Sequence, residues 1–187
     1  MLKAISITGV ALCLSLYPLI VYFGLQYTSI EYISLILIAL VATRLVLSHQ
    51  LLKRLPWLLP ASILSVILLG TAWWFKSEVG LLLYPVIINL VMAITFTFSL
   101  FIGPPVIETF ARIREPDLDE KGVKYTRKVT KVWCLFFVLN GSVALYTSLF
   151  TSLATWTLYN GLIAYILIAG LMAIEWLIRK KVKNSVD

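Results

Sequence analysis

The stretch VWCLFFVLNGSVALYTSLFT, residues 132–151, decides the fold of this chain. It contains no charged residue, and its length is close to the roughly 20 residues that a helix needs to cross the hydrocarbon core of a bilayer. The whole chain shares this character, with 60% hydrophobic residues, 13% charged residues and a mean hydropathy of +0.94. Ordinary soluble domains are about half apolar and about one quarter charged. The sequence therefore predicts an integral membrane protein.

Further apolar runs on both sides of this stretch predict an all-α, polytopic fold with six transmembrane helices. The expected helices lie at about residues 4–26, 30–48, 57–75, 80–102, 132–151 and 154–178. The longest polar interval, the loop 103–131, is shorter than the roughly 50 residues that a small soluble domain needs. We therefore expect residues 1–187 to form a single transmembrane domain.

The distribution of basic residues predicts the orientation of these helices. If the N-terminus is cytoplasmic, fifteen of the sixteen Lys and Arg residues fall on the cytoplasmic side, and only Lys76 falls on the other. Cytoplasmic loops of membrane proteins carry such an excess. We expect a multi-pass protein of the bacterial inner membrane with both termini and the loop 103–131 in the cytoplasm. Anionic lipid beside these residues accounts for the net charge of +7 without nucleic acid.

Several kinds of catalytic site are excluded by the residues present. The only histidine, His49, is followed five positions later by Arg54, so the His-x4-Asp arrangement of many glycerolipid acyltransferases is missing. Cys13 and Cys134 both fall within predicted helices, and two cysteines with one histidine cannot build a typical zinc cluster. There is no Gly-rich phosphate loop and no Gly-x-Ser-x-Gly elbow. The sequence predicts no metal site and no cofactor, and it leaves any catalytic residue unknown.

Three asparagines, Asn89, Asn140 and Asn160, fall inside predicted spans. Polar side chains at this depth face the interior of the helix bundle, because lipid offers them no hydrogen-bond partner. We favour hydrogen bonds between helices for them, while a transport cavity lined by the three is the alternative. A proton or ion pathway would need acidic residues at mid-depth, and the sequence has none there.

Two similar strings, LYPLIV at 16–21 and LYPVII at 83–88, stand in the first and fourth predicted helices. Such a match could mark an inverted repeat of two three-helix halves. We favour chance, because the match does not extend further and the strings are expected at different depths. Kinks are expected near both prolines.

The loop 103–131 begins with a predicted amphipathic helix. Gly103-Pro104-Pro105 ends the fourth span, and apolar residues then recur at helical spacing from Val106 to Arg114. This pattern predicts a short helix lying in the inner membrane interface between the fourth and fifth spans. Glu108 and Arg112 stand four residues apart and should form an ion pair.

One face of polar and aromatic residues at helical spacing begins before the fifth span and continues into it. Thr126, Thr130, Trp133, Phe137 and Asn140 recur at intervals of four, three, four and three, which predicts a face that packs on another helix. The opposite sides carry basic residues that could serve only as anchors at the inner leaflet or could bind an anionic headgroup. The candidate lipid- or partner-binding residues are Glu108, Arg112, Arg114, Asp117, Tyr125, Arg127, Lys128 and Trp133.

The segments 98–144 and 159–181, with the motifs GPP, ARIREPDL, YTRKVTKVWC and NG, resemble a family of bacterial inner-membrane proteins. Its members are typically encoded in aryl polyene pigment and fatty-acid-synthase-like gene clusters, beside acyl carrier proteins. More distantly, the VWCLFF..NG helix is similar to intracellular septation proteins of the inner membrane. The resemblance implies a place of action rather than a reaction, since the family has no established catalytic residues.

Together, these features predict an inner-membrane accessory protein, and we favour a protein without enzymatic activity. We expect it to act in the synthesis, anchoring or transfer of a lipid-linked acyl or aryl polyene product. Its expected partners are anionic lipid headgroups and, in addition, an acyl carrier protein or biosynthetic enzymes; an oligomer stays open. A small transporter or flippase is one alternative. A membrane-embedded acyl or lipid transferase is another, for which Asp117, Asp119 and Glu108 are the only plausible acids.

Overall fold

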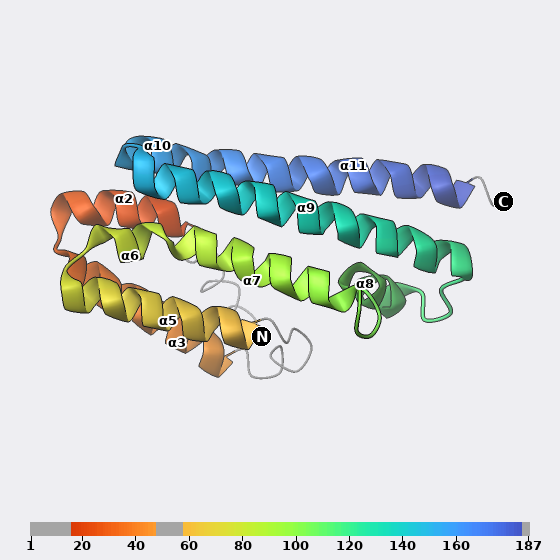
Figure 1. Cartoon of the computed structure of the whole chain (residues 1–187), viewed down its shortest axis with the longest axis horizontal. Coiled ribbons are helices and arrows are strands. Elements are labelled where there is room, and N and C mark those ends of the chain that lie inside the picture. The colour runs from red at the N-terminus through yellow and green to blue at the C-terminus, as the bar shows by residue number, and fades with distance from the viewer. Residues whose placement is uncertain (1–15, 48–57, 185–187) are drawn as a thin grey trace.

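The computed structural model describes residues 16–47 and 58–184, and within these ranges every regular element is a helix. The long helices run roughly side by side along the long axis of the molecule (Figure 1). They are α2 (Tyr17–Tyr27), α3 (Ile30–Leu47), α5 (Leu58–Phe75), α6 (Glu78–Leu82), α7 (Tyr84–Ser99), α8 (Val106–Arg114), α9 (Glu120–Phe150), α10 (Leu153–Leu158), the π-helix η1 (Tyr159–Ile163) and α11 (Ala164–Asn184).

Three helical segments of the described chain are long and apolar enough to cross a membrane: Glu78–Ser99, Glu120–Phe150 and Leu153–Lys180. Leu59–Phe75 is a shorter apolar helix. The all-helical fold is therefore confirmed, with helices long and apolar enough for a membrane protein, while the number of six spans and their orientation stay predictions. Part of the first expected span, residues 4–15, lies outside the described residues, as do His49 and Cys13.

Helix α9 begins earlier than hydropathy alone indicated. It starts at Glu120 rather than near residue 132, so the second half of the expected loop is helical. The Asp119 side chain accepts a hydrogen bond from the Gly122 amide at 2.8 Å and caps the helix. With 31 residues, α9 is about 46 Å long, which exceeds the hydrocarbon core by about 16 Å. The additional length is the polar part of the helix.

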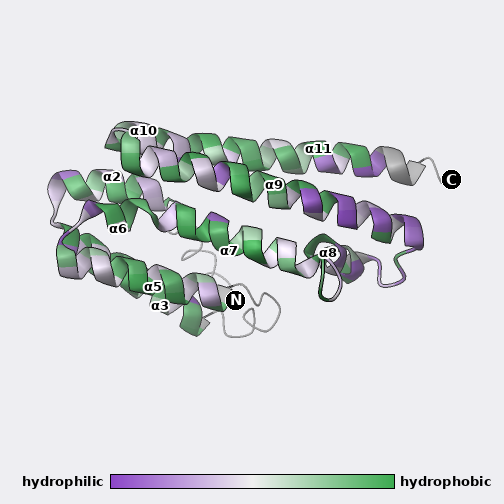
Figure 2. Ribbon diagram, in the orientation of Figure 1, coloured by the Kyte–Doolittle hydropathy of each residue, from purple (hydrophilic) through white to green (hydrophobic). Residues whose placement is uncertain are grey.

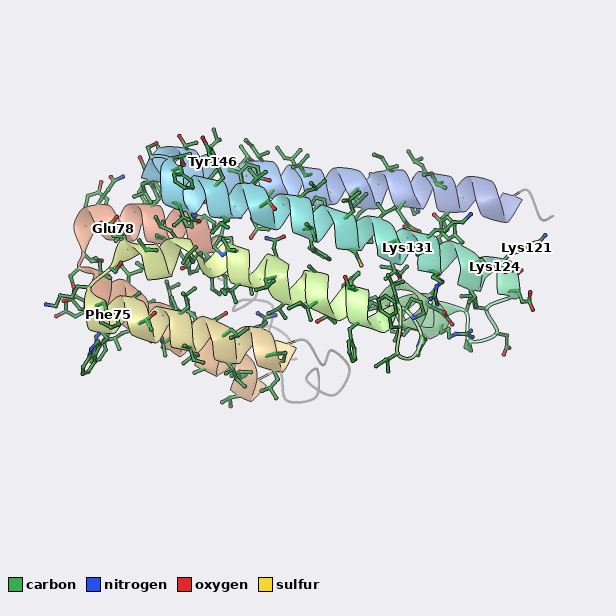
Figure 3. All side chains as sticks on the ribbon, viewed as in Figure 1. Phe75, Glu78, Lys121, Lys124, Lys131 and Tyr146 are labelled. Atoms are coloured by element: carbon green, nitrogen blue, oxygen red, sulfur yellow. The ribbon has the colours of Figure 1, made fainter. Side chains whose placement is uncertain are left out.

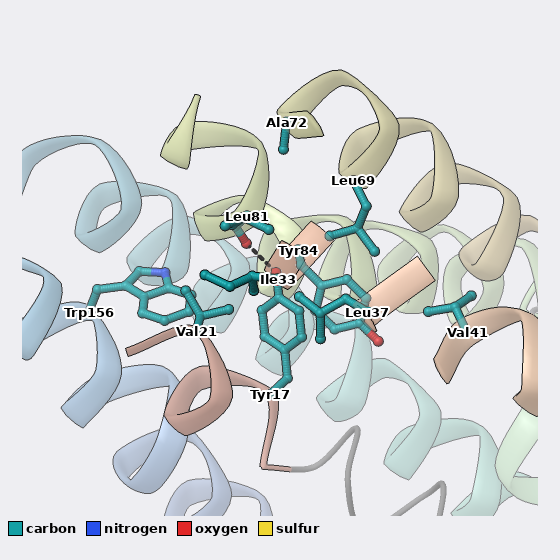
Figure 4. Close-up of a cluster of buried hydrophobic side chains, with 10 residues drawn as sticks. All are labelled: Tyr17, Val21, Ile33, Leu37, Val41, Leu69, Ala72, Leu81, Tyr84 and Trp156. Atoms are coloured by element: carbon teal, nitrogen blue, oxygen red, sulfur yellow. Dashed lines mark hydrogen bonds between the residues drawn. The ribbon is translucent and has the colours of Figure 1, made fainter. Parts of the chain in front are cut away.

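The apolar segment from Glu78 to Ser99 is interrupted at Leu83, where α6 ends and α7 begins. Pro85 has no amide proton, so it leaves the carbonyl four residues earlier, Leu81 O, without its usual helical donor. The hydroxyl of Tyr17 donates to Leu81 O (Figure 4). The neighbouring Leu82 O accepts from Ser148 Oγ at 2.8 Å and from Trp156 Nε1 at 3.0 Å. A kink near Pro85 is thus confirmed.

The main core surrounds this interruption and joins segments that are far apart in the sequence (Figure 4). The rings of Tyr17 and Tyr84 stack with centroids 4.2 Å apart, and Trp156 packs edge-on against Tyr17. The LYPLIV and LYPVII strings therefore meet, and the expectation that they lie at different depths is wrong. The other members of this cluster are Val21, Ile33, Leu37, Val41, Leu69, Ala72 and Leu81.

A second, smaller core lies toward the other end of the molecule, where α8 meets α7 and α9. Ala93, Phe96 and Phe137 are buried there, with Val106 and Ile107 of α8 packed against them. Helix α8 has the bounds that the amphipathic pattern predicts. This small core fixes α8 against the two long helices.

Candidate functional site

Helix α8 is held in place by polar contacts as well as by the small core. The Val106 amide donates to Ser99 Oγ at 3.2 Å, across a turn in which Gly103 has a φ of 81°. On α8 itself, Phe110 and Ile113 are exposed, whereas Glu108 is buried. The helix therefore turns its acidic residue toward the protein and apolar side chains outward, as an interfacial helix does.

The predicted pair of Glu108 and Arg112 is confirmed. Arg112 donates from Nε at 2.9 Å and from Nη2 at 2.8 Å to the same carboxylate oxygen, and its Nη1 donates to Pro116 O at 3.0 Å. The guanidinium group thus joins α8 to the turn that follows it. Because all three nitrogens have partners, Arg112 serves the structure of this region first.

Arg127 has a comparable structural contact. Its Nη2 donates to Leu100 O at 2.7 Å, at the end of α7, where carbonyls lack helical partners. Among the other candidate residues, Lys128 and Asp117 are exposed, and the Arg114 side chain lies outside the described part of the chain. Both located arginines therefore tie elements together, and binding of an anionic headgroup or a partner by them stays a prediction.

Two aromatic candidates pack within the protein. The Trp133 ring lies 5.5 Å from the Phe137 ring and 6.5 Å from the Phe96 ring, centroid to centroid. The Tyr125 hydroxyl donates to Glu175 O at 3.3 Å and lies 3.4 Å from Glu175 Oε1, which connects α9 to α11. These residues position the basic end of α9 and offer little free surface.

The face of α9 predicted to pack on another helix does so. Thr126, Thr130, Phe137 and Asn140 are buried, and Trp133 is half-buried. The threonine hydroxyls donate within the helix, from Thr126 to Val123 O at 2.9 Å and from Thr130 to Thr126 O at 2.9 Å. The polar start of α9 is consequently fixed on one side.

The opposite side of α9 carries what we call the lysine row: Lys121, Lys124, Lys128 and Lys131, all exposed. Their spacing of three, four and three residues places them within an arc of about 80° on the helix surface. Figure 3 shows Lys121, Lys124 and Lys131 near one end of the molecule, while Glu78, Phe75 and Tyr146 lie at the other. Only Lys128 of this row was among the candidates. The other three could have been identified from the sequence, because their helical spacing places them opposite the buried face that contains Thr126 and Thr130.

The asparagines form two separate groups inside the bundle. Asn140 Nδ2 donates to Asn89 Oδ1 at 2.9 Å, Tyr159 OH donates to Asn140 Oδ1 at 2.8 Å, and Asn89 Nδ2 donates to Pro85 O at 2.8 Å. This network joins α7, α9 and η1. A Cβ atom on Gly141 would lie 3.0 Å from Asn89 Cβ, so the glycine permits the close approach of α7 and α9. No pattern in the sequence indicates that Tyr159 takes part.

Asn160 does not join this network. Its Nδ2 donates to Thr147 Oγ1 at 3.2 Å and to Trp156 O at 3.0 Å. It thereby holds η1 against α9 and stabilises the π-helical turn. The three asparagines thus all make hydrogen bonds in buried surroundings, as the packing interpretation predicts.

Two of the three acidic candidates near the loop are engaged in structural contacts, while the third, Asp117, is exposed. Glu108 pairs with Arg112, and Asp119 caps α9. In residues 16–47 and 58–184, no three His, Cys, Asp or Glu side chains come together in a way that could hold a metal ion. This end of the molecule is therefore built to present positive charge on a fixed scaffold.

The comparisons with known proteins give a family. The family model for intracellular septation protein A matches residues 10–184, nearly the whole chain. No curated protein and no solved structure gives a significant match. The more distant of the two resemblances is thus the one confirmed, and the chain belongs to the intracellular septation protein A family.

Proposed function

We propose that this protein is an inner-membrane accessory protein whose cytoplasmic end binds anionic partners, with six spans and both termini in the cytoplasm. The observation that carries the proposal is the separation of charge along the molecule. The hydrophilic residues of α8 and of the first turns of α9 gather at one end, whereas the rest of the long helices is mainly hydrophobic (Figure 2). The lysine row lies at this end (Figure 3).

Anionic lipid headgroups are the first ligands of this surface. Lys128 and Lys131 stand within about 6 Å, measured along the helix axis, of residue 132, where the uncharged stretch begins. The headgroup layer is about 5–7 Å thick on each side of the hydrocarbon core. Two exposed ammonium groups therefore lie at phosphate depth in this proposal, and α8, which packs on α9, exposes the apolar residues Phe110 and Ile113.

A second part of the proposal concerns the soluble partner and the product on which the protein acts. A basic membrane surface attracts acidic soluble proteins, and an acyl carrier protein is one of these. We propose that the protein supports the synthesis, anchoring or transfer of a lipid-linked acyl or aryl polyene product. Deleting the gene and profiling membrane lipids tests this: loss of the product supports a function in synthesis, and its accumulation at the inner membrane supports one in transfer. An unchanged profile argues against both.

The alternatives have less support from the geometry. A transporter or flippase would need free polar groups along a path, but Asn89, Asn140 and Asn160 are buried and hydrogen-bonded. A transferase would need an available acid near the loop; Glu108 is paired and Asp119 caps a helix, which leaves the exposed Asp117 as the one candidate acid for it. The surface of the cytoplasmic end is the feature that stays free to bind.

Headgroup binding is tested by lipid-dependent thermal stability. The purified protein in a neutral detergent is titrated with phosphatidylglycerol or with phosphatidylcholine, and the unfolding midpoint is measured. A ligand that binds only the folded state raises this midpoint. We expect phosphatidylglycerol to raise it more than phosphatidylcholine, and Lys128→Gln/Lys131→Gln to remove the difference. Lys76→Gln, at the opposite end, is the control. Equal shifts with both lipids would refute headgroup binding.

A further inference from the structure

The lysine row extends further along α9 than a lipid headgroup can reach. From Lys121 to Lys131 the row covers about 15 Å, at 1.5 Å per residue. The headgroup layer is only about 5–7 Å thick. With Lys128 and Lys131 at phosphate depth, as the proposed function has it, Lys124 and Lys121 stand about 12 and 16 Å from the start of the apolar stretch. These two lysines therefore point into the cytoplasm beyond the lipid phosphates.

The outer part of the row has acidic neighbours at the start of α9, Asp117, Asp119 and Glu120, and of these Glu120 forms an ion pair with the row. Glu120 approaches Lys124 at 3.7 Å, but both side chains are largely exposed, and such a pair contributes little. Neighbouring lysines three or four residues apart on a helix repel each other. The opposite face of α9 is buried against the protein, so α9 cannot rotate about its axis and the lysine row stays on the outer surface. The row is a fixed line of positive charge with an open outer side.

The spacing of the row defines the shape of its ligand. Side chains three and four residues apart on a helix lie about 5–6 Å from one another. Acidic side chains at the same spacing on a second helix would therefore meet the lysines one by one. We infer that Lys121 and Lys124, continued by Lys128 and Lys131, dock the acidic face of a helix in a soluble cytoplasmic protein. The inference rests on the proposed function for the cytoplasmic orientation of α9.

Lysine suits this kind of contact better than the arginines nearby. Arg112 and Arg127 are occupied by the carboxylate of Glu108 and by backbone carbonyls. The lysine ammonium is a compact, strongly hydrated charge on a flexible chain, and it forms exposed pairs that are weak and reversible. A row of such charges speeds the encounter with an acidic partner and keeps the complex short-lived. The partner is thus expected to bind and leave repeatedly, with strong dependence on salt.

The test uses the full-length protein in nanodiscs of phosphatidylcholine, where no anionic headgroup competes for the row. The probe is a fluorescent helical peptide with four glutamates spaced three, four and three residues apart, and its matched control has glutamines in their place. Binding is measured by fluorescence anisotropy at low salt. The variants are Lys121→Glu/Lys124→Glu and the milder Lys121→Gln/Lys124→Gln. Lys76→Glu, at the opposite end of the molecule, is the charge-reversal control away from the row.

We expect the glutamate peptide to bind and the glutamine peptide not to bind. Lys121→Glu/Lys124→Glu should weaken binding about tenfold or more, because two attractive contacts become repulsive. Lys121→Gln/Lys124→Gln should give a smaller loss, and the control Lys76→Glu should change binding by less than about twofold, since distant surface charges are screened. Stabilisation by phosphatidylglycerol should persist in Lys121→Glu/Lys124→Glu. Unchanged peptide binding in that variant, or equal binding of both peptides, overturns the inference.

A further pair of variants separates this inference from the proposed function. If Lys128→Glu/Lys131→Glu abolishes both peptide binding and the effect of phosphatidylglycerol while Lys121→Glu/Lys124→Glu changes neither, Lys121 and Lys124 take no part in binding. The docking inference then fails and the proposed function stands. If the unchanged protein distinguishes neither the two lipids nor the two peptides, both fail.

Discussion

Replacing Asn140 by alanine tests whether the buried amide network holds the bundle together. Asn140 donates to Asn89 Oδ1 at 2.9 Å and accepts from Tyr159 OH at 2.8 Å, so Asn140→Ala removes one bond to α7 and one to η1. It also leaves two polar groups without partners in a buried position, where lipid cannot replace them.

The expected loss follows from the number of bonds. Hydrogen bonds between membrane helices average about 0.6 kcal/mol each and reach about 1.7 kcal/mol. With two such bonds removed, Asn140→Ala should lower the free energy of unfolding by about 1–3 kcal/mol. Tyr159→Phe removes only one of them and should cost about 1 kcal/mol. Asn89→Ala and Asn140→Ala should couple by about 0.6–1.7 kcal/mol in a double-mutant cycle, because they share one bond.

The free energy of unfolding is measured by denaturation of the purified protein in mixed micelles. Ser142→Ala is the matched control on the same helix, since Ser142 is exposed and donates only to Val138 O within α9. It should change stability by less than about 0.5 kcal/mol. If Asn140→Ala is no more costly than this control, or if the cycle shows no coupling, the network does not hold α7, α9 and η1 together.

Three further predictions use the same unfolding measurement. Arg112→Ala should lower the free energy of unfolding by about 1–3 kcal/mol, because it leaves the buried carboxylate of Glu108 unpaired. Glu108→Gln should cost less, because the arginine that it leaves unpaired is half-exposed and reaches water. Equal losses for the two variants would contradict this. Gly141→Leu should cost about 1–3 kcal/mol, since its Cβ would already press on α7; a neutral effect would mean that the two helices can separate freely. Trp156→Phe should cost about 1 kcal/mol through the bond to Leu82 O, and a larger loss would indicate a packing defect instead.

Local patterns were sufficient for part of the fold and of the candidate site. Helix α8 was predicted with its bounds, because prolines before it and after it confine a short amphipathic repeat. The buried face of α9 was predicted because its polar members recur at helical intervals among apolar ones. In both cases the signal lies within one turn or two of the chain, where side-chain spacing alone defines which residues share a face.

The early start of α9 could not be found from hydropathy. Hydropathy measures the tendency to enter lipid, and the segment from 120 to 131 is polar yet helical. Its cap at Asp119 and its helix-forming Lys, Glu and Arg residues were the available signals. Treating the segment as a loop concealed the lysine row, because a row exists only once the helical register is known.

The contacts of Tyr17 and Tyr159 depend on tertiary structure. Tyr17 reaches a carbonyl 64 residues away, and Tyr159 reaches Asn140 only because the π-helical turn sets its direction. Neither contact leaves a periodic trace in the sequence. The similar LYP strings did carry information, since the tyrosine of the first string serves the carbonyl that the proline of the second leaves free.

The interruption between α6 and α7 also has a consequence for how the chain matures during synthesis. The Leu82 carbonyl is satisfied by Ser148 and Trp156, which the ribosome adds long after α7 has emerged. An unsatisfied carbonyl in lipid costs several kcal/mol, so the interrupted segment cannot settle in its final form while these partners are missing. The segment from Glu78 to Ser99 thus reaches its final structure only after the last third of the chain has been inserted. Products that stop before residue 148 should therefore be substrates for membrane quality control.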